Sequence, residues 1–441
     1  MSDWTTDSNE CLSISLVRSA EDKESLKEDE SYDEFHPAFT YPIFGEEEKI
    51  YGYKDLTIDL KFASGSLSQY LSVKWSDKLQ SVDTVDNVDG TIREFLAEGI
   101  ETDEDAFQAL VEKDATSFKP SGEMIYSYTR STTKGKGKSL GTEQLDPEDE
   151  DAVVYEVYHN TWNTPGFREY HRKMQIFILL YIEAGSYINE EEEGWEFVVL
   201  YEKRKRRGTP NQTTYHFMGY SSLYNFYYFP EKVRLRLSQF VILGPYQRSG
   251  HGCKSIIANC RRGSGPCFTA ELYRSIYQYV LSQPHIGELT VEDPAEAFED
   301  LRDKNDLKML LSTKQFMEEG FGQDTYSHGG GRVGKVGRAL KGPSKGKMGP
   351  PVDKGWAEKW RLKLKIAGRQ FQRLVEMLIQ MHLDPLDARG ARAYRLQVKE
   401  RLYRFNFEVL AQMEKEERLE KLEETFQSVR EDYDRILKLV H

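Results

Sequence analysis

The sequence has little cysteine, no long apolar run and no excess of positive charge. Only 4 cysteines occur in 441 residues, too few for a disulfide framework, so we expect a reducing compartment, the cytoplasm and nucleus. The longest apolar run, residues 176–182, is far shorter than the roughly 20 residues of a membrane helix. The acidic start of the chain also has no signal-peptide core, so we expect a soluble, non-secreted protein.

Acidic residues outnumber basic ones, because 60 Lys and Arg stand against 73 Asp and Glu, a formal net charge of −13. This charge disfavours binding to DNA or to an anionic membrane surface and favours a cationic substrate. We therefore expect no membrane and no direct nucleic-acid partner. With 39% hydrophobic and 12% aromatic residues, the chain can bury sizeable cores, which excludes a wholly disordered protein.

Composition and periodicity divide the chain into segments and predict an α+β fold. Residues 1–34 are rich in Ser, Asp, Glu and Lys, which predicts a mobile acidic arm. The following domains are predicted as a β-rich domain at 35–152, an α/β unit at 153–320, a Gly/Lys-rich linker at 327–352 and a helical domain at 353–441.

Hydrophobic patterns predict the elements of the α/β unit. We expect a buried helix over 165–188, antiparallel strands at 196–201, 213–223 and 234–243, a helix at 271–282 and a strand at 288–291. In the helical domain we expect three helices. The last of them has an apolar face that we expect to pack on its own chain rather than on a coiled-coil partner, because three heptads are marginal alone.

The segment that follows the third predicted strand carries the most informative motif. Gln247, Gly250 and Gly252 form a Gln-x-x-Gly-x-Gly loop between that strand and a predicted helix. Glycines allow successive backbone amides to turn toward one point, which makes a cradle for an anion such as pyrophosphate at a helix N-terminus. The loop lacks the terminal Gly-Lys-Ser/Thr of a nucleotide-hydrolysing loop, which disfavours ATP chemistry.

This loop resembles the coenzyme A pyrophosphate loop of the GNAT acetyltransferase superfamily. The flanking sequence is similar to that of one family within this superfamily, the catalytic subunits of type B histone acetyltransferases, in a fungal form. Matching segments include FHPAF at 35–39, PGFREYH at 165–171, VEDP at 291–294 and LEETFQ at 422–427. The resemblance extends from about residue 35 to the end of the chain.

The resemblance implies acetyl transfer from acetyl-CoA to lysines in the tail of newly made histone four. The positions that match the acetyl-CoA site are Val241, Ile242, Leu243, Gln247, Arg248, Ser249, Gly250, His251 and Gly252. The positions that match the proposed general bases are Glu292, Asp293 and Glu183. The positions that match histone-tail contacts are Glu46, Glu47, Glu48, Trp195, Tyr224, Asn225 and Phe226.

The resemblance also implies two protein partners. They are the histone four tail, together with its histone partner, and a WD-repeat β-propeller histone chaperone.

The candidate bases fit the chemistry of lysine acetylation. A lysine ammonium has a pKa of about 10.4, so only about one molecule in 10³ is neutral at pH 7. A carboxylate within hydrogen-bond reach is the simplest base for removing the proton. Glu292 and Asp293 are neighbours at a strand end, so their side chains should point to opposite faces unless the backbone bends before Pro294. We expect a strand amide near Leu243 to polarise the thioester carbonyl.

Residues 253–269 interrupt the match, because the family's loop leads at once into the helix. Cys253, Cys260 and Cys267 lie here at six-residue gaps, which do not fit zinc spacing, so we expect no metal. The segment is predicted to be a translated intron: residues 253–255 can be encoded by a run containing GTAAGT, residues 258–259 by GCTAAC, and residues 268–270 can close with an ACAG acceptor. The alternative is a non-catalytic histone-binding scaffold with a spoiled cofactor loop.

Overall fold

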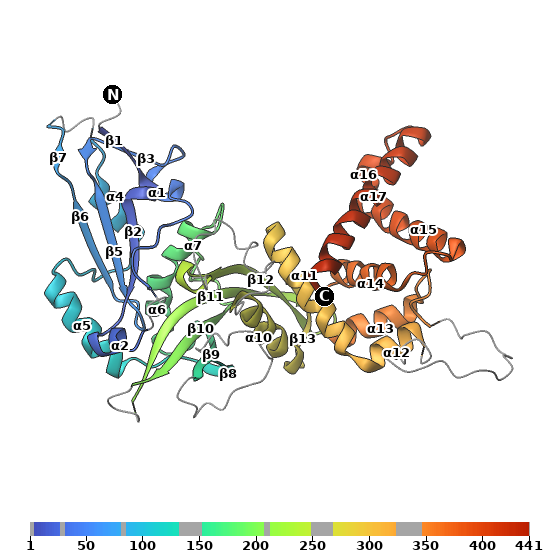
Figure 1. The fold of residues 1–441 in the computed structure, drawn as a ribbon, viewed down its shortest axis with the longest axis horizontal. Helices are drawn as coiled ribbons and strands as arrows, with labels where there is room; N and C mark the ends of the chain where they lie inside the picture. The colour runs from blue at the N-terminus through green and yellow to red at the C-terminus, as the bar shows by residue number, and fades with distance from the viewer. Residues whose placement is uncertain are drawn as a thin grey trace. The chain divides into compact units, whose positions relative to one another are not determined.

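The computed structural model describes residues 4–26, 31–80, 85–131, 152–206, 212–247, 268–322 and 346–440. They form two compact units, which are described separately. The first unit spans Met1–Tyr227 and Leu235–Tyr279, and the second spans Tyr228–Arg234 and Val280–His441. Helices and strands occur in both, and the predicted α+β class is confirmed (Figure 1).

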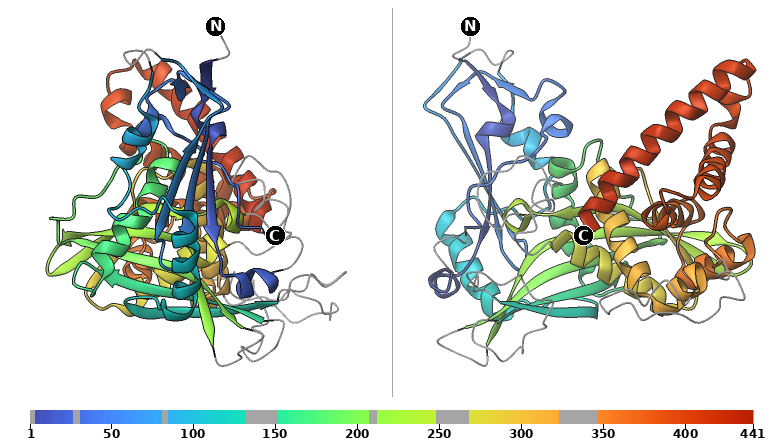
Figure 2. Two further views of the ribbon diagram at one scale, coloured as in Figure 1. Left: turned by 90° about the vertical axis from the view of Figure 1, so that its left-hand side faces the viewer. Right: turned by 45° about the vertical axis from the view of Figure 1, so that its right-hand side comes forward.

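The N-terminal part of the first unit is built on a three-stranded sheet in the order β2-β5-β6, with β2 parallel to β5 and β5 antiparallel to β6 (Figures 1 and 2). The strands of this N-terminal part, inside and outside that sheet, are β1 (Thr5–Asp7), β2 (Leu12–Val17), β3 (Lys49–Tyr51), β4 (Tyr53–Lys54), β5 (Thr57–Ala63), β6 (Gln69–Lys74) and β7 (Asp77–Lys78). Its helices are α1 (Ser8–Cys11), α2 (Ala20–Glu24), α3 (Tyr41–Phe44), α4 (Val88–Arg93) and α5 (Glu104–Ser117).

The expectation of a mobile acidic arm is wrong for residues 4–26. Leu12 and Ile14 of β2 are fully buried, because their strand pairs with β5 in the middle of the sheet. Acidic residues in this segment act as helix caps: the Asp7 carboxylate accepts the Asn9 and Glu10 amides of α1. A composition rich in Ser, Asp and Glu is therefore compatible here with helix caps and a buried edge strand.

The central part of the first unit is a twisted antiparallel sheet with helices on both faces. Its elements are β8 (Glu123–Ser131), β9 (Ala152–Thr161), α6 (Phe167–Met174), α7 (Ile176–Tyr181), β10 (Trp195–Lys205), β11 (Thr213–Tyr228), β12 (Lys232–Ile242), α8 (Gly244–Gln247) and α10 (Phe268–Ser282). The strands β8, β9, β10 and β11 pair antiparallel in that order, and β12 follows β11. The predicted antiparallel pairing of the strands now labelled β10 and β11 is confirmed.

Alternation along β10 explains why both faces are covered. Phe197 points toward α6, where it packs on Phe167 at 5.0 Å between ring centroids. On the opposite face, His159 of β9 stacks on Tyr279 of α10 at 4.6 Å. The sheet therefore carries two packed layers, one under α6 and one under α10.

One buried histidine of α6 makes the stability of this unit depend on pH. His171 is fully buried among aromatic rings, and burial lowers its pKa to about 4 from 6.5. Because the folded-state pKa lies below the unfolded one, the unfolded chain binds the proton first as the pH falls. We expect the free energy of unfolding to fall between about pH 6.5 and pH 4, by up to about 1.4 kcal/mol per pH unit. Denaturant unfolding of the parent and of His171→Phe at several pH values measures this, and the variant's free energy of unfolding should depend less on pH. An equally steep fall of the free energy of unfolding in both proteins would contradict the prediction.

The second unit contains one complete strand, the first residues of β12 and a set of helices. Its elements are β13 (Ile286–Val291), α11 (Glu296–Ser312), α12 (Lys314–Phe321), α13 (Lys354–Leu364), α14 (Gly368–His382), α15 (Ala388–Phe405), α16 (Phe407–Leu410) and α17 (Lys415–Val440). β13 joins the start of β12, where the Val233 amide donates to the His285 carbonyl at 3.0 Å.

The long helix α17 packs on its own chain, as its apolar pattern predicts. Its buried side chains include Phe426, Tyr433 and Ile436, which face α11, α14 and α15. Buried ion pairs add to the packing: Arg401 of α15 binds the Glu376 carboxylate of α14 at 2.8 Å, and the Tyr433 hydroxyl donates to the same carboxylate at 2.8 Å.

Candidate functional site

The end of β12 forms the described part of the predicted acetyl-CoA site. The side chains of Val241, Ile242 and Leu243 are at most 3% exposed, so contact with a ligand there would involve mainly the backbone. The Leu243 amide itself donates to the Met218 carbonyl at 2.9 Å. The expectation that an amide near Leu243 polarises the thioester therefore cannot be met by the Leu243 amide in this conformation.

Gln247 ends the four-residue helix α8 and bends back on the strand. Its side-chain amide donates to the Ile242 carbonyl, which closes the turn between β12 and α8. The remaining predicted pyrophosphate residues lie outside the described part of the chain. They are Arg248, Ser249, Gly250, His251 and Gly252, and the interrupting residues 253–267 lie outside it as well.

Glu183 lies in an exposed turn after α7. The single buried helix expected over 165–188 is instead two helices, α6 and α7, and the second ends at Tyr181. Glu183 is therefore accessible, where a helix continued to Ile188 would have placed it among apolar side chains. The next residue ties this turn to α3, because the Ala184 amide donates to the Tyr41 hydroxyl at 2.5 Å.

Glu292 and Asp293 follow the last residue of β13 in the second unit, and both are exposed. Asp293 has a φ of 29°, in the left-handed region that non-glycine residues rarely adopt. The chain therefore bends at Asp293, before Pro294. Because of this bend, the side chains of Glu292 and Asp293 need not point to opposite faces, as they would in a regular strand.

The three glutamates predicted to contact the histone tail divide into two groups. Glu46 and Glu47 are exposed in the turn after α3. The Glu48 carboxylate instead accepts the Thr40 and Tyr41 amides at 2.7 and 3.1 Å. The hydrogen bond from the Thr40 amide lowers the pKa of the Glu48 carboxyl. Glu48 therefore holds the start of α3, and Glu46 and Glu47 remain as the exposed acidic pair.

Substitutions should separate these two roles. We expect Glu48→Ala to destabilise the fold by about 1 kcal/mol, as loss of a helix cap does. We expect the double variant Glu46→Gln/Glu47→Gln to keep the parent's unfolding temperature but to bind a basic tail peptide a few-fold more weakly, most clearly at low salt. Thermal unfolding and peptide titration at two salt concentrations measure both effects. A Glu48→Ala protein of parental stability would contradict the cap.

The predicted aromatic contacts form one row on the α6 face of the sheet. Trp195 and Tyr224 are register partners on β10 and β11, and their rings meet edge to face at 4.8 Å. Tyr224 in turn contacts Phe226 at 4.8 Å, and the Arg236 guanidinium lies 4.3 Å over the Phe226 ring. The indole nitrogen of Trp195 is shielded from solvent and has no hydrogen-bond partner among the described residues. The row therefore offers aromatic faces, because the shielded indole nitrogen is not accessible to a ligand.

Asn225 does not belong to this row. Its side-chain amide donates to the Glu196 carboxylate at 2.6 Å, on the opposite face of the sheet, where Glu196 also contacts His159 at 2.8 Å. Asn225 is thus a support for the strand ends, because alternation turns it away from Tyr224 and Phe226. Sequence reasoning missed Glu196 and His159, since 37 residues separate them and no local pattern connects them.

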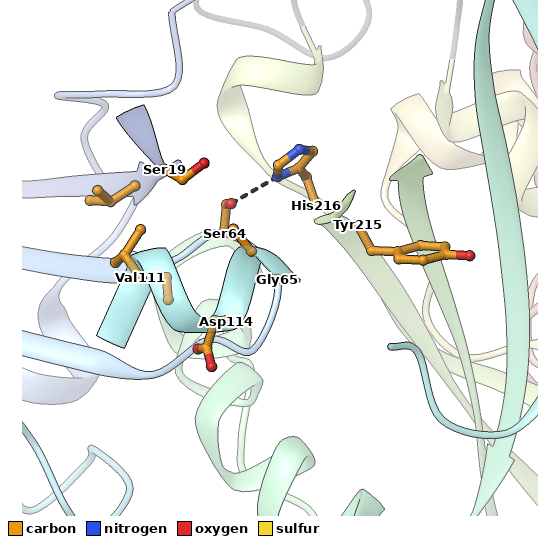
Figure 3. Close-up of a pocket in the computed structure, with 10 residues that line it drawn as sticks. Ser19, Ser64, Gly65, Val111, Asp114, Tyr215 and His216 are labelled. Atoms are coloured by element: carbon orange, nitrogen blue, oxygen red, sulfur yellow. Dashed lines mark hydrogen bonds between the residues drawn. The ribbon is translucent and has the colours of Figure 1, made fainter. Parts of the chain in front are cut away.

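A small cavity in the first unit holds a Ser-His pair that the sequence does not reveal. Ser64 Oγ lies 2.8 Å from Nδ1 of the buried His216 (Figure 3). Burial lowers the pKa of His216 far below its usual value, and its Nε2 contacts Thr214 at 3.1 Å. Figure 3 shows the Asp114 carboxylate pointing away from the imidazole. Within the described ranges the His216 ring bonds Ser64 and Thr214 and no carboxylate, and both Ser64 and His216 are buried. The pair therefore joins the two sheets rather than forming a nucleophile.

The described ranges contain no candidate for a membrane span or a metal site. No helix in those ranges is both long and apolar enough to span a bilayer. No group of three or more His, Cys, Asp or Glu side chains there is placed to hold a metal ion.

Comparison with known proteins identifies the family. The model of the histone acetyl transferase HAT1 N-terminus matches residues 4–183, and that of the fungal HAT1 C-terminal region matches residues 343–384. The histone acetyltransferase type B catalytic subunit of Cryptococcus neoformans is 47% identical over 445 residues, which cover 99% of this chain and 98% of the relative. That of Mycosarcoma maydis is 41% identical, over 98% of this chain and 87% of the relative. The chain therefore belongs to the family of histone acetyltransferase type B catalytic subunits, and it is an acetyltransferase that acts on histones.

Proposed function

We propose that this enzyme transfers the acetyl group of acetyl-CoA to lysines in the N-terminal tail of newly synthesised histone four, before chromatin assembly. The observation that carries the proposal is similarity over nearly the whole length of the type B catalytic subunits. The net charge of −13 suits a basic substrate. The family implies acetyl-CoA as the cosubstrate.

Transfer is direct in this proposal. The neutral lysine nitrogen attacks the thioester carbonyl, the carbon–sulfur bond breaks, and coenzyme A leaves as the thiol or thiolate. The lysine proton goes to a carboxylate, for which Glu292 is the first choice and Asp293 and Glu183 are the others. All three are exposed, so each is accessible to a substrate lysine. Among the described residues, Val241, Ile242, Leu243 and Gln247 would hold the cosubstrate.

The first unit offers complementary surfaces for a basic tail. Glu46 and Glu47 supply exposed negative charge, and Glu183 lies in the turn that bonds to Tyr41 of the adjoining helix α3. The row of Trp195, Tyr224 and Phe226 supplies aromatic faces on which lysine side chains can pack. Opposite charge and aromatic rings are the contacts that a lysine-rich, glycine-rich peptide can use.

The proposal extends to partners and compartment. Newly synthesised histones are made in the cytoplasm and used in the nucleus, so we propose that the enzyme works in both. The family resemblance further suggests histone four with its histone partner, and a WD-repeat β-propeller histone chaperone that presents them.

A peptide competition tests the substrate. The full chain is incubated with acetyl-CoA and equal amounts of the histone four tail peptide and a scrambled peptide of the same composition, and the products are analysed by mass spectrometry. We expect acetylation mainly of the native-order peptide, at defined lysines. Equal modification of both peptides would contradict tail recognition, and absence of any acetyl transfer would contradict the proposal as a whole.

A further inference from the structure

A buried tyrosine anchors the short helix α8, which leads from β12 into the predicted cofactor loop. Tyr246 is 5% exposed, and its ring lies 5.1 Å from that of Tyr32. Its hydroxyl accepts a hydrogen bond from Arg18 Nη2 at 3.0 Å and donates to Glu202 Oε2 at 3.2 Å. A four-residue helix has few bonds of its own, so these side-chain bonds fix its position.

The charges around Tyr246 form a closed network. Arg18 Nη2 lies 2.5 Å from Glu202 Oε2, and both side chains are 1% exposed. Arg204 Nε lies 2.5 Å from the other carboxylate oxygen of Glu202. Burial alone would raise the pKa of Glu202, but the two guanidiniums hold it well below its usual range. Glu202 is therefore ionised and keeps Arg204 as a partner even when another contact is removed.

Arg18 brings the N-terminal sheet into this network. It follows β2, the strand that pairs with β5, and its guanidinium lies 3.9 Å over the Tyr32 ring. Within the described ranges its Nε and Nη1 atoms are buried and have no hydrogen-bond partner. Its guanidinium contacts are thus concentrated on Glu202, Tyr246 and Tyr32, which lie 184, 228 and 14 residues away in the sequence.

We infer that Arg18 is a positioning residue for the acetyl-CoA site. Its hydrogen bond to the Tyr246 hydroxyl fixes the position of α8, and with it the segment 241–247, relative to the N-terminal sheet. This inference rests on the proposed acetyl-CoA site. Arg18 touches no substrate. A shift of α8 moves Gln247, whose side chain closes the turn onto the Ile242 carbonyl. The N-terminal half of the protein, where histone-tail contacts are predicted, thereby also sets the geometry of cosubstrate binding.

The first test removes only the hydroxyl. In Tyr246→Phe the ring stays in place and Glu202 keeps both guanidiniums. We expect the Kd and KM for acetyl-CoA to rise roughly 3- to 10-fold, which is the effect of losing one hydrogen bond. The KM for the histone tail peptide and kcat should stay within about twofold of the parent's values. The matched control is Tyr170→Phe. It removes another buried hydroxyl, which donates to the Gly65 carbonyl at 2.9 Å in the same unit but does not contact α8.

A double-mutant cycle then asks whether Arg18 acts through Tyr246. The lysine side chain is shorter than that of arginine, so its ammonium does not reach the position from which Nη2 contacts both Glu202 Oε2 and the Tyr246 hydroxyl. Arg18→Lys alone should therefore weaken acetyl-CoA binding. In the Tyr246→Phe background, the same change should weaken it much less. Thermal unfolding of every variant reports folding separately, and Tyr246→Phe alone decides the question if Arg18→Lys does not fold.

The outcomes are distinguishable. Equal acetyl-CoA Kd values for the Tyr246→Phe and Tyr170→Phe proteins, or additive effects in the cycle, would overturn the positioning role while the parent remains active. Absence of acetyl-CoA binding by the parent would instead overturn the proposed cosubstrate site. A rise in the KM for acetyl-CoA confined to the Tyr246 and Arg18 variants supports the inference.

Discussion

Replacing Glu292 by glutamine should lower kcat by about 100-fold or more while leaving the Kd for acetyl-CoA nearly unchanged. Glutamine keeps the size of the side chain but cannot accept the lysine proton. A lysine with a pKa of about 10.4 then has to lose its proton to water. Glu292 is exposed directly after β13, and glutamine matches its size, so the apolar core keeps its packing. Steady-state kinetics and calorimetry with acetyl-CoA measure the two quantities.

The matched control is Glu296→Gln, a change of the same kind four residues further along, at an exposed side chain in the first turn of α11. It should leave kcat unchanged. The parallel variants Asp293→Asn and Glu183→Gln rank the other carboxylates. A Glu292→Gln enzyme within about threefold of the parent would remove Glu292 from the role and transfer it to whichever of these two variants loses the most activity.

Local patterns were sufficient where one face of an element packs on its own neighbours. The strands β10, β11 and β12 and the apolar face of α17 were predicted from alternation and heptad spacing, because burial alone determines those residues. The break between α6 and α7 was not. No proline or glycine marks it; the Ile178 amide bonds to the Gln175 carbonyl, a tighter i to i+3 turn that depends on tertiary packing.

The helical region shows the same limit. Within residues 354–440 the structure has five helices instead of the expected three. Short helices such as α16, four residues long, have too few turns to produce a readable period. Their ends are set by contacts with neighbouring helices rather than by propensity.

At the candidate site, sequence could indicate residue types but not which partner each side chain meets. Glu48 belongs to an acidic run, yet its carboxylate binds backbone amides of α3. Asn225 stands between two aromatic residues of the row, yet it faces Glu196. The bond between Arg18 and Glu202 joins residues 184 positions apart. Such pairings arise from the topology of two sheets and leave no trace in local spacing.

Removing residues 253–269 should strengthen acetyl-CoA binding by at least about tenfold. The deletion joins Gly252 to Ala270 in the first turn of α10, whose anchoring side chains Leu272, Tyr273 and Ile276 are at most 3% exposed and remain in place. The glycine loop would then lead directly into a helix N-terminus, where backbone amides and the helix dipole favour an anion. That interaction is worth up to about 2 kcal/mol, and tenfold in affinity corresponds to about 1.4 kcal/mol.

Calorimetry on the chain with and without residues 253–269 measures this effect, and sequencing of cDNA across the junction shows which form the cell makes. If the segment is an intron, as its coding possibilities indicate, mature transcripts lack it and the shorter chain is the enzyme. The segment would otherwise carry Pro266 and the glycines at 263 and 265 between the loop and α10, residues that interrupt a helix. Transcripts that keep the segment throughout would contradict the intron. Equal affinity of the two chains would mean that the pyrophosphate cradle does not depend on direct continuation from Gly252 into α10.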